Sequence, residues 1–145
     1  MGNVFKGDVI NDDYAFSVHV PNELLGWGGV SQDAPFHGFT VFLNTLNLSD
    51  ACIDFEIHRR TDNDEESNYP DSVHQVRLGN ISGWELIQKE KIMGMEVKIV
   101  RTSFSYRKGY EVIEGIITMS ILERDYLKGK AIYDKFLESF KFNEG

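Results

Sequence analysis

One run of the sequence has the residue types and spacing that can hold a divalent cation. Carboxylates stand at alternate positions in Asp62, Asp64 and Glu66, as at the start of a calcium-binding loop, because hard cations prefer several carboxylate oxygens. An EF-hand that begins at Asp62 needs glycine at its sixth position and glutamate at its twelfth, where this chain has Ser67 and Val73. We therefore expect no metal here. The run is interpreted as a solvated loop, or as an acidic contact surface for a basic partner, formed by Asp62, Asp64, Glu65 and Glu66.

The histidines and the cysteine show no catalytic or zinc-binding spacing. His19, His37, His58 and His74 include no pair at i, i+2 or i, i+4, the spacings that bring two imidazoles onto one face of a strand or helix. Cys52 and His58 could pair as a thiolate and an imidazole, but six residues of extended strand separate them by about 20 Å. No Gly-x-Ser-x-Gly segment presents a serine nucleophile. We therefore predict no catalytic residue, no metal and no cofactor, and a buried, unreactive Cys52.

A glycine-rich segment, Gly26-Trp27-Gly28-Gly29, surrounds one of the two tryptophans. It is not a dinucleotide-binding fingerprint, because Ser31 stands where the last glycine belongs and no βαβ pattern surrounds it. We interpret the glycines as a tight turn, within a loop over 21–35, that presents Trp27. An exposed tryptophan is a frequent hot-spot residue at protein interfaces, so Trp27 is a candidate binding residue. The alternative is a tryptophan that folds onto the core.

Length and charge limit the classes of function. The 145 residues are the size of one domain, and we expect a single domain over 1–145. Fifteen Lys and Arg against 23 Asp and Glu give a net charge of -8, which argues against nucleic acid or an anionic membrane as a non-specific partner. No run of about 20 apolar residues could span a bilayer, so we expect no membrane insertion. Residues 1–6 contain no signal-peptide apolar region. The cytoplasm therefore remains open, as does the periplasm if a signal peptide has been removed.

Apolar and polar residues alternate along most of the chain. The alternation predicts strands over 15–20, 37–44, 52–59, 84–91, 95–106 and 110–122, with 37–44 covered on both faces and 73–78 open between strand and helix. After Leu122 the period becomes helical, and Gly129 is expected to let the helix approach the sheet closely. The residues expected to face the sheet are Tyr126, Tyr133, Phe136, Leu137 and Phe140, with Phe136 close to fully buried. The predicted fold class is α+β, an antiparallel β-sheet with an amphipathic C-terminal helix packed on one face.

Both ends of the chain resemble the PsbP-like family. The resemblance is carried by Tyr14–Pro21, by Gly26-Trp27 after it, and by Ile132–Phe142, which is similar to the family's closing helix and its Ser-Phe-x-Phe ending. It implies a small α/β/α sandwich. It implies no catalytic residues, because the family shares no catalytic constellation, and its members are mostly accessory or binding proteins, often outside the cytoplasm.

Two functions remain as hypotheses, and both leave the oligomeric state open. The first is a non-enzymatic protein-binding module, most concretely a bacterial inhibitor or immunity-type protein, because an acidic protein attracts a basic protein partner. The second is a small-molecule carrier, or a PsbP-like accessory protein, with an apolar pocket between sheet and helix. The residues that would line this pocket, or simply fill the core, are Phe36, Phe39, Phe42, Trp84, Phe104 and Tyr106. An enzyme would need two titratable groups that converge in a cleft.

Overall fold

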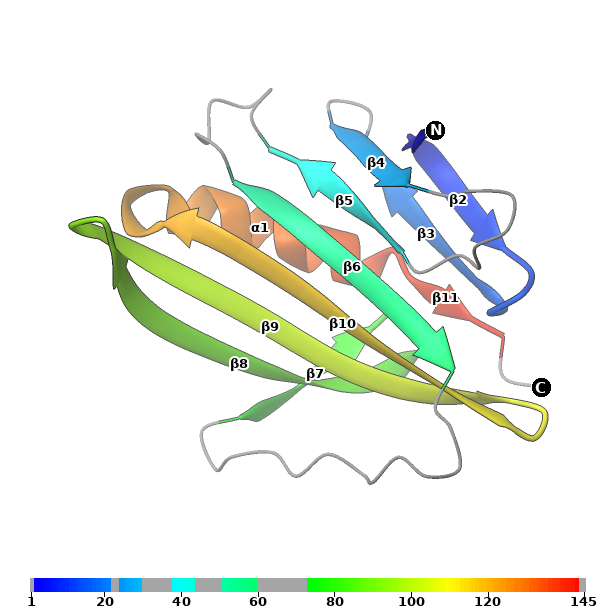
Figure 1. Ribbon diagram of the computed structural model, residues 1–145. Helices are drawn as coiled ribbons and strands as arrows, with labels where there is room; N and C mark the ends of the chain where they lie inside the picture. The colour runs from blue at the N-terminus through cyan, green and yellow to red at the C-terminus, as the bar shows by residue number, and fades with distance from the viewer. Residues whose placement is uncertain (1, 22–23, 30–37, 44–50, 60–72, 144–145) are drawn as a thin grey trace.

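The structure, a computed structural model, describes residues 2–21, 24–29, 38–43, 51–59 and 73–143 (Figure 1). Its larger layer is an eight-stranded antiparallel sheet. From one edge to the other the strands are β1 (Gly2–Phe5), β4 (Leu25–Gly29), β5 (Gly38–Phe42), β6 (Cys52–Arg59), β10 (Glu111–Leu122), β9 (Met95–Lys108), β8 (Ile81–Ile92) and β7 (His74–Leu78). This order joins the β7–β8–β9–β10 meander to the N-terminal strands through the pairing of β10 with β6.

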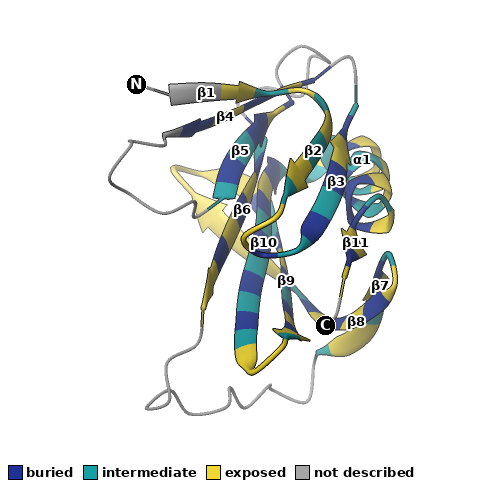
Figure 2. Ribbon diagram, turned by 90° about the vertical axis from the view of Figure 1, so that its right-hand side faces the viewer, coloured by how far each residue is buried: buried dark blue, intermediate teal, exposed yellow. Residues whose placement is uncertain are grey.

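The smaller layer covers one face of this sheet. It contains α1 (Tyr126–Glu138), which follows a 3-10 turn at Glu123–Asp125, and a three-stranded antiparallel sheet in the order β11 (Lys141–Phe142), β3 (Phe16–Val20) and β2 (Gly7–Asn11). Figure 2 shows the two layers side on, with buried residues between them. No helix in the described part of the chain is long and apolar enough to cross a membrane. The predicted α+β class, an antiparallel sheet with a C-terminal helix on one face, is confirmed.

The core is built from alternate strand residues and one face of the helix. Phe16 of β3 meets Phe55 of β6 edge-on, with 5.5 Å between the ring centroids, so aromatic rings join the two layers. A Cβ placed on Gly129 would lie 2.3 Å from Cδ1 of Ile121, so α1 approaches β10 as closely as glycine allows, as predicted. The predicted sheet-facing residues of the helical segment are buried, or packed against the core in the case of Tyr126: Tyr126, Tyr133, Phe136, Leu137 and Phe140.

The prediction of a loop and tight turn around Trp27 is wrong, because these residues form strand β4. Gly26 and Gly28 lie on the buried side of the strand. A Cβ would lie 2.9 Å from the carbonyl oxygen of Phe5 at Gly26, and 2.8 Å from the ring of Phe5 at Gly28. The rings of Phe5 and Phe39 stack in this space with centroids 4.6 Å apart. The glycines therefore let aromatic rings pack directly against a strand. A glycine-rich composition alone does not distinguish this role from a tight turn.

The structure differs from the sequence predictions, or decides what they left open, at three further places. Strands β1 and β2, separated only by Lys6, are not among the predicted strands, because each contains an adjacent apolar pair, Val4-Phe5 and Val9-Ile10, in place of alternation. Segment 73–78 proves to contain strand β7. The expectation that 37–44 is covered on both faces is wrong at Phe42, which is 37% exposed. It points to the face of the sheet opposite α1, here called the outer face, where the described residues place no helix (Figure 2).

Candidate binding surface

One corner of the outer face is apolar and exposed. Val4, Leu25, Trp27 and Phe42 are between 37% and 56% exposed. They are cross-strand neighbours, since Val4 pairs with Trp27 between β1 and β4, and Leu25 pairs with Phe42 between β4 and β5. We call these four residues the Trp27 patch. A contiguous exposed apolar patch is typical of an interaction site, whereas single exposed apolar residues are not.

Carboxylates border the Trp27 patch on strand β6. Thr40 lies opposite Trp27 on one side and Asp54 on the other, and its hydroxyl donates a 2.6 Å hydrogen bond to Oδ1 of Asp54. Glu56 is the next exposed residue along β6 on the same side. Neither Asp54 nor Glu56 has an ion-pair partner among the described residues. The patch therefore has an acidic border whose charge the described fold does not neutralise.

Cys52 and His58 also lie on the outward side of β6, near its two ends. His58 Nε2 is 3.6 Å from Oε2 of Glu114, so the imidazole pairs with a carboxylate and not with the thiol. Cys52 is half-buried, a correction to the expected full burial. Burial raises the pKa of the Cys52 thiol and the charge of Asp54 raises it further, so the protonated form is favoured at neutral pH.

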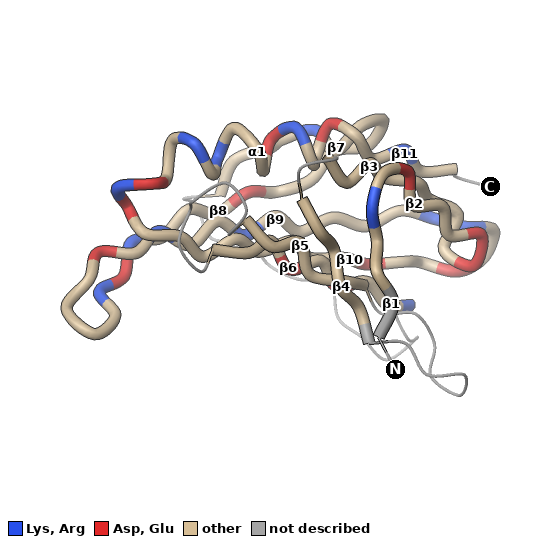
Figure 3. Tube along the Cα trace, turned by 90° about the horizontal axis from the view of Figure 1, so that it is seen from above, with Lys and Arg blue, Asp and Glu red and all other residues tan. Residues whose placement is uncertain are grey.

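The acidic residues predicted as a contact surface, Asp62, Asp64, Glu65 and Glu66, lie outside the described residues. Nine of the 23 Asp and Glu lie outside them, but only one of the 15 Lys and Arg, so the described residues carry 14 of each sign. Figure 3 shows these charges interspersed over the fold. The net charge of -8 therefore comes from the remaining segments, and five of the nine acidic residues are in 60–72.

Titratable groups do converge under α1, at the side of the sheet formed by β7 and β8. Glu85 of β8 is only 3% exposed, and its Oε1 lies 3.3 Å from Nζ of Lys130 and 3.5 Å from Nε2 of His74. Lys130 also donates to Asp134, one helical turn away. Burial alone would lower the pKa of Lys130, but its hydrogen bond to Asp134 and the charge of Glu85 outweigh burial, so the pKa is raised. Lys130 therefore stays an ammonium between two carboxylates, which suits a structural role better than acid–base catalysis.

Tyr133 extends this polar cluster into the core. Its hydroxyl donates to the carbonyl oxygen of Ile117 at 2.9 Å and accepts from the hydroxyl of Thr102. Burial raises the pKa of Tyr133, and the charges of Glu85 and Asp134 add to the rise, while the hydrogen bond with Thr102 opposes it. The hydroxyl is thus held protonated as a hydrogen-bond donor inside the fold.

Alkaline pH should destabilise the protein, because Tyr133 and Tyr106 must both stay protonated in the folded state. Burial raises the pKa of each above its ordinary value of 10.0. Stability is therefore intact below pH 10.0 and falls above it, by about 1.4 kcal/mol per pH unit for each such tyrosine. Urea unfolding from about pH 9 to about pH 11.5 measures this slope. Tyr133→Phe should lower this slope by the contribution of one tyrosine. The control Tyr110→Phe, at an exposed site, should leave the slope unchanged. An unchanged slope in Tyr133→Phe would contradict the burial effect.

Five of the six residues proposed to line a carrier pocket are described, and they lie on different faces of the sheet. Phe39, Phe104 and Tyr106 are buried in the core, with the last two rings stacked at 6.3 Å between centroids. Phe42 and Trp84 lie on the outer face, exposed by 37% and 40%. Phe36 lies outside the described residues. The five described residues of this set therefore belong to the core or to the outer surface.

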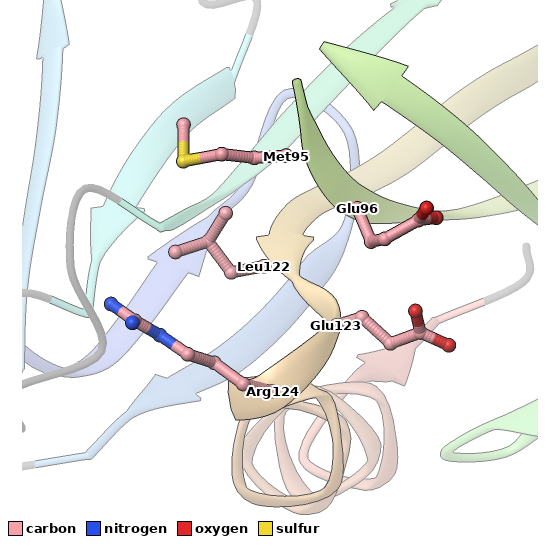
Figure 4. A pocket seen from close by; sticks show the side chains of 5 residues that line it. All are labelled: Met95, Glu96, Leu122, Glu123 and Arg124. Carbon is pink, nitrogen blue, oxygen red and sulfur yellow. The ribbon is translucent and has the colours of Figure 1, made fainter. Parts of the chain in front are cut away.

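A surface cavity of about 360 Å³ lies elsewhere, near the tip of the β8–β9 hairpin. Figure 4 shows that Met95, Leu122 and Arg124 point to one side of it, while Glu96 and Glu123 point to the other. None of these residues belongs to the Trp27 patch or to the polar cluster around Glu85. The cavity therefore adds nothing to either site.

The sequence predicts Trp27 as a candidate binding residue, but it does not predict that Val4, Leu25 and Phe42 lie beside it. These residues become neighbours only through the pairing of β4 with β1 and β5, and the sequence does not predict that β4 is a strand. For Asp54 a signal was present, because alternation along 52–59 already places it on the polar side of β6, away from the core.

A scan of protein-family models finds none that matches this sequence. A search of curated proteins finds no match either. Solved structures do match over nearly the whole chain, so the likeness to known proteins lies in the arrangement of helices and strands.

LpqN of Mycobacterium tuberculosis, a protein involved in cell envelope biogenesis, matches with a TM-score of 0.66 and 13% identity, over 97% of this chain and 92% of LpqN. A Bacteroides thetaiotaomicron VPI-5482 protein matches with a TM-score of 0.64 and 9% identity, over 96% of this chain. The match covers 49% of that protein, so this chain spans about half its length. Cyanobacterial PsbP from Synechocystis sp. PCC 6803 is also similar, with a TM-score of 0.47 and 9% identity over 98% of this chain and 92% of PsbP. At such identities the likeness is one of fold alone: this chain has the fold of LpqN and of the Bacteroides protein.

Proposed function

We propose that this protein is a non-enzymatic binding module that docks a basic protein partner through the Trp27 patch. The observation that carries the proposal is the exposure of four large apolar side chains at one corner of a sheet face, beside carboxylates without ion-pair partners in the described structure. Tryptophan is among the residues most enriched at interface hot spots, and charged borders favour partners of opposite sign. The most concrete form of the proposal is a bacterial inhibitor or immunity-type protein that covers a basic surface of its target.

The polar groups of the fold support a binding role over an enzymatic one. The titratable side chains that converge, Glu85, Lys130 and Asp134, are engaged with one another under α1. The groups beside the Trp27 patch offer a carboxylate and a hydroxyl already hydrogen-bonded together, which can bind a cation but do not form a nucleophile and base. LpqN is involved in cell envelope biogenesis, and an extracytoplasmic place of action is part of this proposal.

The proposal is tested by removing the tryptophan. A stoichiometric partner is first captured from a lysate of the source cells at low salt, and its affinity is then measured with purified proteins. Trp27→Ala should weaken binding by at least about 30-fold, because truncation of a hot-spot residue costs about 2 kcal/mol or more. Tyr110→Ala is the matched control, since Tyr110 is a fully exposed aromatic residue in the β9–β10 turn, and it should bind as the wild type does. Binding of the partner by Trp27→Ala with the affinity of the wild type would contradict the proposal.

The acidic segment formed by Asp62, Asp64, Glu65 and Glu66 is expected to attract the partner and not to stabilise the fold. The triple change Asp64→Asn, Glu65→Gln and Glu66→Gln should slow association and reduce its dependence on salt, because surface charge acts mainly on the association rate. Stability should change by less than about 1 kcal/mol, since the sequence predicts a solvated loop here and exposed charges contribute little. The measurements are stopped-flow association at several salt concentrations and thermal melting. The control is the triple change Glu90→Gln, Glu96→Gln and Glu138→Gln, which alters the charge by the same amount. These three positions are exposed and have no ion-pair partner in the described structure. Equal rates in both triple variants would contradict a directed role for the segment.

A further inference from the structure

The Trp27 patch and its acidic border together suit one kind of side chain. Resting on the proposed function, we propose that the partner presents an arginine to this surface, with its guanidinium stacked on Trp27 and paired with Asp54. The patch then recognises a specific basic residue, in addition to attracting positive charge in general.

Strand register places the two recognition groups at a suitable separation. Trp27, Thr40 and Asp54 stand opposite one another on the adjacent strands β4, β5 and β6, and all three lie on the outer face. Neighbouring strands are about 4.8 Å apart, so two steps separate the Cα atoms of Trp27 and Asp54 by about 10 Å. Thr40 has the shortest side chain of the three, and a guanidinium lying over it can reach both neighbours.

Asp54 is a hydrogen-bonded acceptor without a cationic partner among the described residues. The hydroxyl of Thr40 donates to its Oδ1 at 2.6 Å, which restrains the carboxylate. A carboxylate has about four lone-pair sites, so Asp54 can still accept two N–H groups of one guanidinium. On the neighbouring strand β10, Glu114 already pairs with His58. The guanidinium in the same row as Asp54 belongs to Arg101, two strands away beyond Thr118, and it makes no ion pair with Asp54.

The chemistry distinguishes arginine from lysine. A guanidinium is planar and delocalised, stacks on an indole ring, and presents parallel N–H donors that match a carboxylate. An ammonium is a compact point charge that gains less from stacking and cannot pair in this bidentate way. An aromatic face and a hydrogen-bonded carboxylate on one surface therefore favour arginine.

The test uses the whole protein and two small probes, acetyl-arginine amide and acetyl-lysine amide. Each is titrated while the indole N–H of Trp27 and the backbone amide of Asp54 are followed by NMR, with Trp84→Phe used to assign the indole signal. The arginine probe should shift both signals saturably and bind more tightly than the lysine probe. Asp54→Asn should weaken arginine binding by about two- to fivefold, the range of an exposed ion pair, and reduce the preference over lysine to the part that stacking on Trp27 provides. Glu138→Gln, which removes an exposed charge on α1, should leave both titrations unchanged.

The results that would overturn the arginine assignment are equal binding of the two probes, shifts that spread over exposed carboxylates in general, or a wild-type response in Asp54→Asn. The partner complex separates this failure from failure of the proposed function. If Trp27→Ala abolishes partner binding while Asp54→Asn leaves it unchanged, the patch binds the partner and the arginine assignment is wrong. If Trp27→Ala leaves partner binding intact, the proposed function is wrong, whatever the probes show.

Discussion

Phe136→Ala should lower the free energy of unfolding by about 3–5 kcal/mol, the range for removing a phenylalanine from a packed core. Phe136 of α1 is 1% exposed, and its ring lies 6.3 Å from that of Phe39 and 5.2 Å from that of Phe140. The alanine variant loses the transfer free energy of the ring and leaves a cavity between helix and sheet. Urea or thermal unfolding measures the loss, which is a large part of the ~5–15 kcal/mol typical of a domain.

The matched control lies on the same helix. Leu127 is 84% exposed, so Leu127→Ala removes an apolar side chain from α1 without opening a cavity, and stability should change by about 0.5 kcal/mol or less. Similar losses in the two variants would show that α1 does not bury the face assigned to it.

Lys130→Met should destabilise the protein by about 3 kcal/mol or more, because it leaves the buried carboxylate of Glu85 without its ammonium. Methionine is unbranched and only one heavy atom shorter than lysine, so the loss reports charge more than packing. Among the described residues, only the exposed imidazole of His74 then remains within ion-pair distance of Glu85.

A double variant tests the cause. Adding Glu85→Gln to Lys130→Met removes the unpaired charge and should recover most of the lost stability, as replacement of both partners of a buried pair commonly does. Glu111→Gln is the surface comparison, since Glu111 and its partner Arg59 are 52% and 39% exposed and the pair contributes about 1 kcal/mol or less. A double variant as unstable as Lys130→Met would contradict the charge explanation.

The fold is predictable from sequence where a segment is long and regularly patterned. β6 and β10 alternate over eight or more residues, and α1 keeps a helical period into Phe140, so residue types indicate both the element and its buried face. β4 has glycine at Gly26 and Gly28, the inward positions, and Phe5 and Phe39 of neighbouring strands fill the space instead. Its composition therefore carries no sign of a buried strand face, and the resulting turn prediction was wrong.

The residues of the proposed binding surface are also predictable from sequence only in part. Trp27 attracts notice by its type, and the outward direction of Asp54 follows from alternation. Val4 and Phe42 join Trp27 only through pairing between strands that are distant in sequence, which no local pattern reports. The polar cluster has the same property, since Glu85 and Lys130 are 45 residues apart. Only the i, i+4 spacing of Lys130 and Asp134 is visible in the sequence.

The central claim, that the Trp27 patch is the partner-binding surface, is tested most directly by oxidative footprinting of the captured complex. Hydroxyl radicals label exposed tryptophan, methionine and tyrosine efficiently, and three such residues lie at different places: Trp27 on the outer face, Met93 at the β8–β9 turn and Tyr110 at the β9–β10 turn, with exposures of 47%, 93% and 103%. On saturation with partner, labelling of Trp27 should fall toward that of the buried Tyr133, while Met93 and Tyr110 stay as reactive as in the free protein. Unchanged labelling of Trp27, with protection at Met93 or Tyr110 instead, would place the interface elsewhere and contradict the account.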